Sequence, residues 1–499
     1  MSPIDQPDDI DTPAADTLGL TVDSMRELGY WVVDQVIDHF CDVAEGPAIR
    51  TGTPGDLRAA LGGPLPEEAG DPLTALQTLV DVALTHMQHG DHPRNFARVP
   101  GPSSFAGVLG DWLATGFNAI AASWGGGSGP ATVELVVLDW LRQLLGLPAG
   151  TEGVMVSGGS MANMTALAAA RASEGPGVCY LCDQAHASIV RALDVLGFPA
   201  EHVRVLESDD HLRLPVEALA EAIRADRAAG RRPGFVVASA GTTNTGAVDP
   251  LPELAELCRA EGLWFHIDGA YGASAALCEA GRRALRGLEK ADSLVLDPHK
   301  WLFQPYDLGC VLVTRPGALA RAFAMTPEYL ADVSAVNDEE VDLRDRSPEL
   351  TRRGRGLKLW LSLRTYGVAR IRAAIAHGIG LAEYAERLIA ADEHWEVVTP
   401  AQLGIVTFAL RNDGVSDDKV QRQGGVEPSD GRFEPAHSVA REQLARAQAL
   451  TADGFAHLTS THLHGRSVLR LCTINPRTTK YDIAATLARL GVSVTGAAQ

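Results

Sequence analysis

A lysine and an aspartate, each beside a short apolar run, are the residues of this sequence best suited to covalent chemistry. Lys300 follows the run Ser293–Leu296 within the motif DPHKW, residues 297–301. Asp268 closes the run Leu263–Ile267, one helix and one strand earlier. A lysine among apolar neighbours loses hydration, which we expect to lower its pKa and to help its amine form a Schiff base. A carboxylate nearby could hold a proton on the nitrogen of a bound ring.

Two further motifs offer groups that bind an anion and a flat ring. The motif SGGSMAN, residues 157–163, lies between an apolar run and an alanine-rich helical segment. Gly159 lets the backbone approach an anion, Ser160 adds a hydroxyl donor, and the helix N-terminus provides N–H groups. His186 follows the run Val178–Leu181, and its imidazole can stack on a ring and transfer protons. Each motif alone is more typical of a helix cap or a turn, but together and in this order they indicate one site.

The elements that must position these motifs alternate between apolar runs and helical segments. Helical patterns occur at residues 162–172, 215–229, 250–260 and 281–290. The runs between and around them are Gly153–Val156, Val178–Leu181, Phe235–Ala238, Leu263–Ile267, Ser293–Leu296 and Gly309–Val313. Near-continuous apolar strands that alternate with helices are typical of an α/β fold with a largely parallel sheet. In such sheets ligands bind beyond the carboxyl ends of the strands, where all four motifs fall.

The flanking segments predict a helical N-terminal part and a small C-terminal domain. Thr21–Val43 and Pro72–His89 have helical apolar patterns but no strands, so their apolar faces must pack on the main domain or on a partner subunit. Near the C-terminus, strands are predicted at 395–398, 404–409 and 468–473 and helices at 439–452 and 481–490, with a loop over 412–434. We divide the chain into residues 1–20, expected to be disordered, a helical segment at 21–90, a large domain at 91–375 and a small α+β domain at 376–499.

The composition argues against several classes of partner. The 499 residues are 46% hydrophobic and 21% charged, which is ordinary for a soluble globular protein. The net charge of −20 argues against nucleic acid or an anionic membrane surface. No apolar stretch reaches the roughly 18 residues of a membrane span, and the acidic N-terminus is unlike a signal peptide. Seven scattered cysteines fit free thiols in a reducing cytoplasm.

No metal site is expected. The C-x-x-C of Cys179 and Cys182 lacks a second Cys/His pair at zinc spacing. His86, His89 and His92 could reach one ion, but packing or solvated roles are more typical of such residues. The histidines at 462 and 464 alternate on a possible strand with no carboxylate nearby.

The four motifs together resemble those of one enzyme family. The chain resembles the pyridoxal-dependent (group II) amino-acid decarboxylases, which include the aromatic-L-amino-acid, histidine and glutamate decarboxylases, from about residue 26 to residue 477. The most specific match is DPHKW, supported by His266–Ala270, by GTT at 241–243 and by RRGRGLKLW at 352–360. The resemblance implies the type I fold of aspartate aminotransferase, with a mostly parallel seven-stranded sheet, and the cofactor pyridoxal 5′-phosphate (PLP). It also implies an amino-acid substrate and a homodimer in which the 21–90 segment clasps the other subunit.

The resemblance also implies a role for each site residue. Lys300 would carry the cofactor as a Schiff base, Asp268 would pair with the pyridine nitrogen, and His186 would stack on the ring; these three are the expected catalytic residues. Ala270 would pack beneath the ring, and Thr243 would lie beside His186 and the cofactor. The residues expected to hold the phosphate are Gly159, Ser160, Ser293 and His299.

Several positions depart from the family pattern. Asp297 stands where the family often has asparagine. Arg94, Asn95 and Ala122 fall where aromatic decarboxylases place ring side chains, which leaves an aromatic, aliphatic or polar substrate open; Arg94 could instead support the dimer. Leu343 stands where the family commonly has a tyrosine thought to return a proton to the substrate carbon.

The expected reaction is decarboxylation of an L-amino acid to CO₂ and an amine. Leu343 cannot donate a proton, so a second reading is decarboxylation coupled to oxidative deamination, which gives an aldehyde. The best substitute proton donor in the sequence is His186. A third reading, a non-catalytic scaffold that retains the fold, is disfavoured by the intact set of Lys300, Asp268 and His186.

Overall fold

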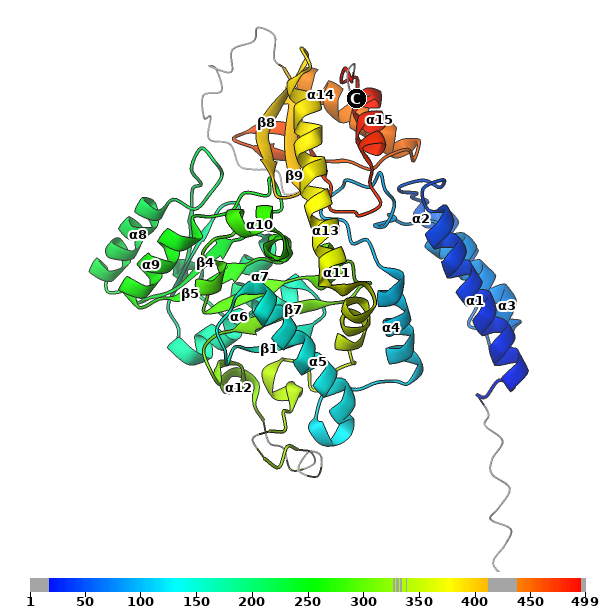
Figure 1. Cartoon of the computed structure of the whole chain (residues 1–499), viewed down its shortest axis with the longest axis horizontal. Coiled ribbons are helices and arrows are strands. Elements are labelled where there is room, and N and C mark those ends of the chain that lie inside the picture. The colour runs from blue at the N-terminus through cyan, green and yellow to red at the C-terminus, as the bar shows by residue number, and fades with distance from the viewer. Residues whose placement is uncertain are drawn as a thin grey trace, which may run out of the picture. The chain divides into compact units, whose positions relative to one another are not determined.

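The computed structural model describes residues 18–325, 339–411 and 438–494, together with residues 328, 332 and 334–337. The first 17 residues and the predicted loop at 412–434 lie outside these ranges. The chain forms two compact units, Met1–Gly46 with Arg50–Gln88 and Pro47–Ile49 with His89–Gln499 (Figure 1). Within the described residues, every helix is too short or too polar to cross a bilayer.

The N-terminal unit consists of helices whose apolar side chains stay exposed. It contains α1 (Val22–Asp42), α2 (Pro54–Leu61), α3 (Pro72–Thr78) and a π-helical turn, η1 (Leu79–Leu84). Side chains of Thr21, Thr53 and Asp71 cap the three helices by accepting backbone N–H groups. None of the three helices has a buried residue; on α1, Met25 is 52% and Tyr30 67% exposed. An apolar stripe of this kind is typical of a helix that packs on another surface.

A seven-stranded sheet forms the centre of the main unit, as predicted. Only β7 runs antiparallel to its neighbours, and the other pairs are parallel. The strand order is β1 (Glu152–Val156), β7 (Gly309–Val313), β6 (Ser293–Leu296), β5 (Trp264–Asp268), β4 (Pro233–Ser239), β2 (Val178–Cys182) and β3 (Val203–Leu206). The edge strand β3 was not predicted, because it lacks the fully buried apolar run of the central strands.

Helices cover both faces of this sheet, and alternate strand residues point into two apolar cores. Met155 packs in one core, while its neighbours Val154 and Val156 pack in the other. The first core includes residues of α5 (Trp124–Leu145), α8 (Val216–Ala228), α9 (Leu251–Glu261) and α13 (Gly356–Ala390). The second includes residues of α6 (Gly159–Glu174), α7 (Ala187–Val195) and α12 (Ala318–Phe323). The remaining helices that precede α13 are α4 (Phe105–Gly116), α10 (Glu279–Ala284) and α11 (Pro298–Trp301).

A second, antiparallel sheet follows the long helix α13 (Figure 1). Its order is β10 (Thr459–Leu463), β11 (Arg466–Cys472), β9 (Ile405–Leu410) and β8 (Trp395–Gln402), and it packs with α14 (Ser438–Ala452) and α15 (Lys480–Leu490). Helix α13 is interrupted at Gly367, whose φ of 71° is left-handed. The predicted domain boundary after residue 375 falls inside this helix.

Candidate functional site

A cavity of about 360 Å³ lies at the carboxyl ends of the strands of the large sheet. The segments after β1, β2, β4, β5 and β6 all contribute to it, because parallel strands end at the same edge. It brings together most of the residues singled out in the sequence: Gly159, Ser160, His186, Thr243, Asp268, Ala270, His299 and Lys300. Ser293 does not line it.

The amine of Lys300 is paired with Asp297 at this cavity. Lys300 Nζ lies 2.9 Å from Asp297 Oδ2, and Asp297 is 1% exposed. Burial lowers the pKa of Lys300, but attraction and hydrogen bonding to Asp297, with a further effect of Asp268, outweigh it and raise that pKa above its ordinary value. The expectation of a lowered pKa for Lys300 is therefore wrong, because the buried carboxylate of Asp297 beside the amine outweighs the desolvation.

One end of the cavity has the shape that a phosphate group needs. A Cβ atom added at Gly159 would lie 2.7 Å from Asp297 Oδ2 and 3.1 Å from the Cβ of Ala270, so only glycine allows the start of α6 to approach these residues this closely. Gly159 and Ser160 begin α6, whose first turn has N–H groups without intrahelical partners. His299 Nδ1 accepts the N–H of Leu308 at 3.2 Å, which leaves Nε2 as the donor of the neutral ring. Burial lowers the pKa of His299.

Asp268 and His186 are both held by buried or partly buried partners. Asp268 Oδ1 accepts the N–H of Ala270 at 3.1 Å, and its Oδ2 accepts a side-chain N–H of Asn163 at 3.0 Å. His186 caps α7, because its Nδ1 accepts the N–H of Ser188 at 3.2 Å. Asn163 and Ser188 also line the cavity. Neither was assigned a role from the sequence, although Asn163 closes the motif SGGSMAN and Ser188 lies two residues after His186.

Ser293 lies in the sheet rather than at the cavity. It is the first residue of β6, at the opposite end of that strand from Asp297. Its Oγ lies 2.8 Å from Trp264 Nε1 and 2.8 Å from His266 Nδ1, and all three residues are buried. In this structure Ser293 therefore supports His266.

The residues that suggested an altered substrate pocket have packing roles. Arg94 Nε donates to the carbonyl of Phe455 at 2.8 Å, and Arg94 pairs with Asp482 at 3.3 Å. Asn95 is buried and donates to the carbonyl of His89 at 2.8 Å. Ala122 is also buried, and none of the three lines the cavity. Arg94 and Asn95 thus have structural partners within the chain.

Leu343 is likewise a core residue in this structure. It is fully buried and packs with Ala121 and Ala131. It is not among the described residues that line the cavity.

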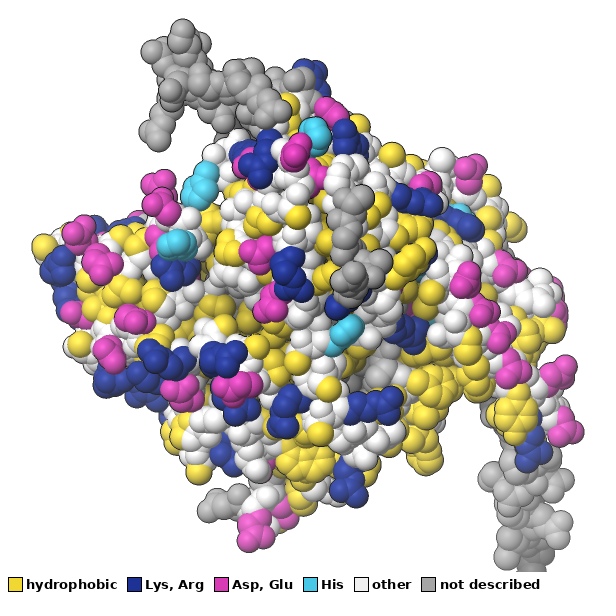
Figure 2. Space-filling model, turned by 45° about the horizontal axis from the view of Figure 1, so that its top comes forward, with side chains coloured by type: hydrophobic (Ala, Val, Ile, Leu, Met, Phe, Trp, Pro, Cys, Tyr) yellow, Lys and Arg dark blue, Asp and Glu magenta, His cyan; other side chains and the backbone are white. Residues whose placement is uncertain are grey.

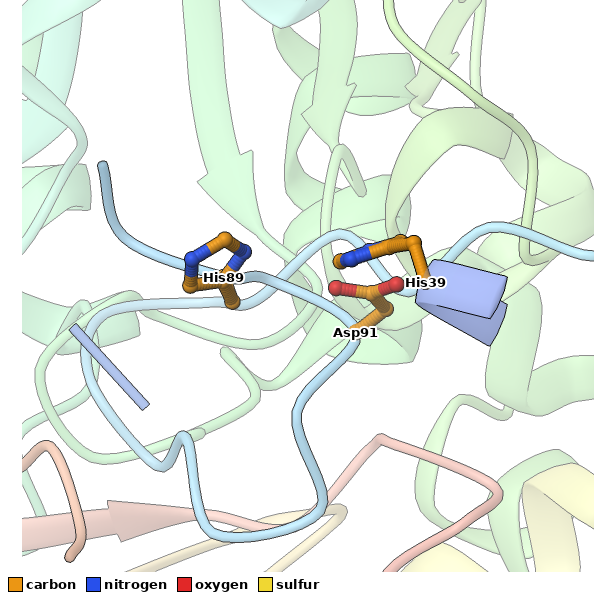
Figure 3. Close-up of side chains that lie close together, drawn as sticks. All are labelled: His39, His89 and Asp91. Atoms are coloured by element: carbon orange, nitrogen blue, oxygen red, sulfur yellow. The ribbon is translucent and has the colours of Figure 1, made fainter. Parts of the chain in front are cut away.

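Two of the histidines considered as metal ligands, His86 and His92, make local hydrogen bonds. His86 Nδ1 lies 2.7 Å from the carbonyl of Val82 on the same helical turn. His92 is buried, and its Nδ1 accepts the N–H of Arg94 at 3.0 Å. Figure 3 shows His89 and Asp91 on one connecting segment of the main unit. All seven cysteines are free thiols.

Comparisons with known proteins agree with this site. The model of the family described as "Pyridoxal-dependent decarboxylase conserved domain" matches residues 54–411. An aromatic-L-amino-acid decarboxylase of Bacillus atrophaeus is 43% identical over 95% of this chain and 96% of its own length. A phenylacetaldehyde synthase of Arabidopsis thaliana is 35% identical over 78% of this chain and 83% of its own length. A crystal structure of Oryza sativa TDC with PLP and tryptamine superposes with a TM-score of 0.86 at 28% identity, covering 95% of this chain and 98% of that one.

The family match spans well over half of the chain, and the relatives match it over most of their own length. Their fold has the mostly parallel sheet described above, and PLP is the cofactor bound in the Oryza sativa structure. The chain therefore belongs to the pyridoxal-dependent decarboxylase family, and it is a PLP-dependent carboxy-lyase that acts on an amino acid.

Proposed function

We propose that this enzyme decarboxylates aromatic L-amino acids to the corresponding amines. The observation that carries the proposal is the 43% identity, over nearly the full length of both chains, to an aromatic-L-amino-acid decarboxylase. The cavity supports it, since none of the described residues that line it is an arginine that could hold a side-chain carboxylate. The packing roles of Arg94 and Asn95 remove the sequence argument against an aromatic side chain.

PLP, when bound, withdraws electrons from the bond to the substrate α-carboxylate. We assign Lys300 as the lysine that attaches it, because no other lysine lines the described part of the cavity. Asp268, at the end of β5, faces the same space and would keep the ring nitrogen protonated. The amides that begin α6 would bind the phosphate. His186 would cover the ring, with the proton of its neutral form on Nε2, since Nδ1 accepts the N–H of Ser188.

A substrate panel tests the proposal. The PLP-loaded enzyme is assayed with L-tyrosine, L-tryptophan, L-phenylalanine, L-histidine, L-glutamate and L-leucine, and the amine is quantified. We expect kcat/KM for at least one aromatic substrate to exceed that for L-glutamate by about 100-fold or more, because a buried carboxylate without a cationic partner is costly. Highest activity with L-glutamate or L-leucine would contradict the proposal.

Aldehyde formation is the second candidate. The relative named as a phenylacetaldehyde synthase favours it, since that protein matches this chain over most of its length. Leu343 gives it little support, because Leu343 is buried among Ala121 and Ala131. The substitution Leu343→Tyr would overpack that core, so the test is the native enzyme itself. Amine, aldehyde and oxygen uptake are measured together: amine without oxygen uptake supports simple decarboxylation, and stoichiometric aldehyde and oxygen uptake support the alternative.

We further propose that the enzyme is a homodimer. Large apolar side chains are exposed on α1, and others, such as Phe117 at the end of α4, are exposed on the main unit. Figure 2 shows hydrophobic side chains open to solvent on one face of the molecule. Obligate dimers bury surfaces of this kind. Light scattering should give twice the mass of the chain at micromolar concentration, and a PLP-saturated monomer would contradict the proposal.

A further inference from the structure

One buried amide joins two polar groups that line the cavity, Asp268 and His186. The side-chain nitrogen of Asn163 donates to Asp268 Oδ2 at 3.0 Å and to Ser188 Oγ at 3.1 Å. Ser188 Oγ in turn lies 2.8 Å from His186 Nδ1. The side-chain oxygen of Asn163 lies 3.0 Å from His266 Nε2. Asn163 is almost fully buried, so water does not compete for these bonds.

The direction of these bonds is fixed from the sheet side. Trp264 Nε1 can only donate, and it donates to Ser293 Oγ at 2.8 Å. The hydroxyl of Ser293 keeps its own proton and can donate it to His266 Nδ1, which is 2.8 Å away. Burial lowers the pKa of His266 to about 4, so this ring is neutral at neutral pH. Because the Asp268 carboxylate can only accept, the Asn163 nitrogen faces it, and the Asn163 oxygen is left to accept from His266 Nε2.

The direction is fixed independently from the helix side. The backbone N–H of Ser188 donates to His186 Nδ1, so Nδ1 is an acceptor. The hydroxyl of Ser188 must then also donate to Nδ1, and its oxygen is left to accept from Asn163. Both ends require the same orientation of the Asn163 amide, with its nitrogen toward Asp268 and Ser188. Both N–H groups of one side chain are thus used: one on Asp268, expected to pair with the ring nitrogen, and one on Ser188, which holds the His186 expected to stack on the ring.

We propose that Asn163 is a positioning residue that fixes the Asp268 carboxylate and the His186 imidazole relative to each other. The proposal rests on the assignment of Asp268 to the pyridine nitrogen and of His186 to the face of the PLP ring. Asp268 needs one defined orientation to keep a proton on the ring nitrogen, and His186 needs its Nε2–H directed into the cavity. The Asn163 amide donates to Asp268 directly and to His186 through Ser188, so it couples the orientations of the two side chains.

The test compares three variants of the PLP-loaded enzyme. Asn163→Leu keeps the approximate shape and removes both donors, whereas Ser188→Ala cuts only the branch to His186. Thr165→Val is the control, because Thr165 is buried on the same helix and its hydroxyl donates only to the carbonyl of Met161. Far-UV circular dichroism checks the fold of each variant. The readouts are the visible circular dichroism of bound PLP, the rate of PLP release to an apoenzyme trap, and kcat and KM separately.

We expect Asn163→Leu to release PLP at least about 10-fold faster, since Asp268 loses a charge-assisted hydrogen bond, and to alter the visible circular dichroism band. Ser188→Ala should keep the wild-type release rate and lose kcat several-fold with little change in KM. Thr165→Val should resemble the wild type throughout. A folded Asn163→Leu variant with wild-type release and dichroism would overturn the proposal, as would equal changes in Thr165→Val. If Asn163→Leu fails to fold, a Ser188→Ala variant with an unchanged kcat would overturn it. PLP release does not depend on the substrate, so this outcome is separate from the substrate panel.

Discussion

Asp297 Oδ2 lies 2.9 Å from Lys300 Nζ, at the end of the cavity where α6 begins. Among the described residues, Asp297 Oδ1 has no hydrogen-bond partner although it is buried. The structure thus sets a carboxylate both beside the lysine that we expect to carry PLP and beside the amides that we expect to bind its phosphate. An asparagine there, as the family often has, would be neutral.

We expect Asp297→Asn to bind inorganic phosphate several-fold more tightly in the PLP-free protein. A carboxylate within about 4 Å of a phosphate costs on the order of 1 kcal/mol or more, and the amide removes that repulsion. Isothermal titration with phosphate measures the change. Asp453→Asn, which alters a surface pair with Arg489, is the control. Unchanged or weaker phosphate binding in Asp297→Asn would show that Asp297 lies away from the phosphate.

The substitution Ser293→Ala separates two roles for that residue. A phosphate ligand would be lost if Ser293 reached the cavity, whereas the hydrogen bonds to Trp264 and His266 imply a structural role. We expect phosphate affinity to stay at the wild-type value and the free energy of unfolding to fall by about 1–3 kcal/mol, because two buried polar groups lose their partner. Phosphate titration and urea denaturation measure both quantities. A clear loss of phosphate affinity would restore Ser293 as a ligand.

The neighbours Arg352 and Arg353 should differ sharply in their effect on stability. Arg352 is fully buried, and it pairs with Glu134 at 2.7 Å and donates to the carbonyls of Ala121 and Met155. Arg352→Met strands the Glu134 charge, so we expect a loss of about 3–5 kcal/mol. The side chain of Arg353 is 40% exposed and pairs with Asp111; Arg353→Met should cost less than about 1 kcal/mol. Equal losses in urea denaturation would contradict this reading of the buried pair.

The enzyme should lose stability as the pH falls from 7 to 5. Burial lowers the pKa of His266 and of His457 to about 4. The unfolded chain then binds more protons than the folded one between about pH 4 and 6.5, so the stabilisation present above pH 6.5 is lost as the pH falls. Each histidine should contribute about 2 kcal/mol of this loss. Urea denaturation at pH 7 and at pH 5 measures the change. The free energy of unfolding of His457→Leu should fall less between these two pH values than that of the wild type, and an identical fall would mean that the pKa of His457 is not lowered in the folded protein.

Strand ends could be predicted from the sequence because the apolar runs are distinct. The runs at 293–296 and 309–313 became β6 and β7 with the same bounds, and the motif after each parallel strand reached the same cavity. What the sequence could not provide is contact between side chains of separate elements. Asn163 reaches Asp268 only because α6 packs across β5, and Arg94 meets Asp482 only once the second sheet is folded. Ser293 lies at the start of β6 and Asp297 just after its end, and a strand rises roughly 3.3 Å per residue, so Ser293 cannot share the cavity.

The identity of the lysine that carries PLP is the central claim, and chemical labelling tests it directly. Reduction of the PLP-loaded enzyme with borohydride, followed by peptide mapping, fixes the cofactor to the amine that holds it. We expect the label on Lys300, which lines the cavity with its amine beside Asp297. Lys358 is buried against Asp111 and two carbonyls, and Lys290 pairs with Glu256. A label on Lys358 or Lys290, with Lys300 unmodified, would contradict the account.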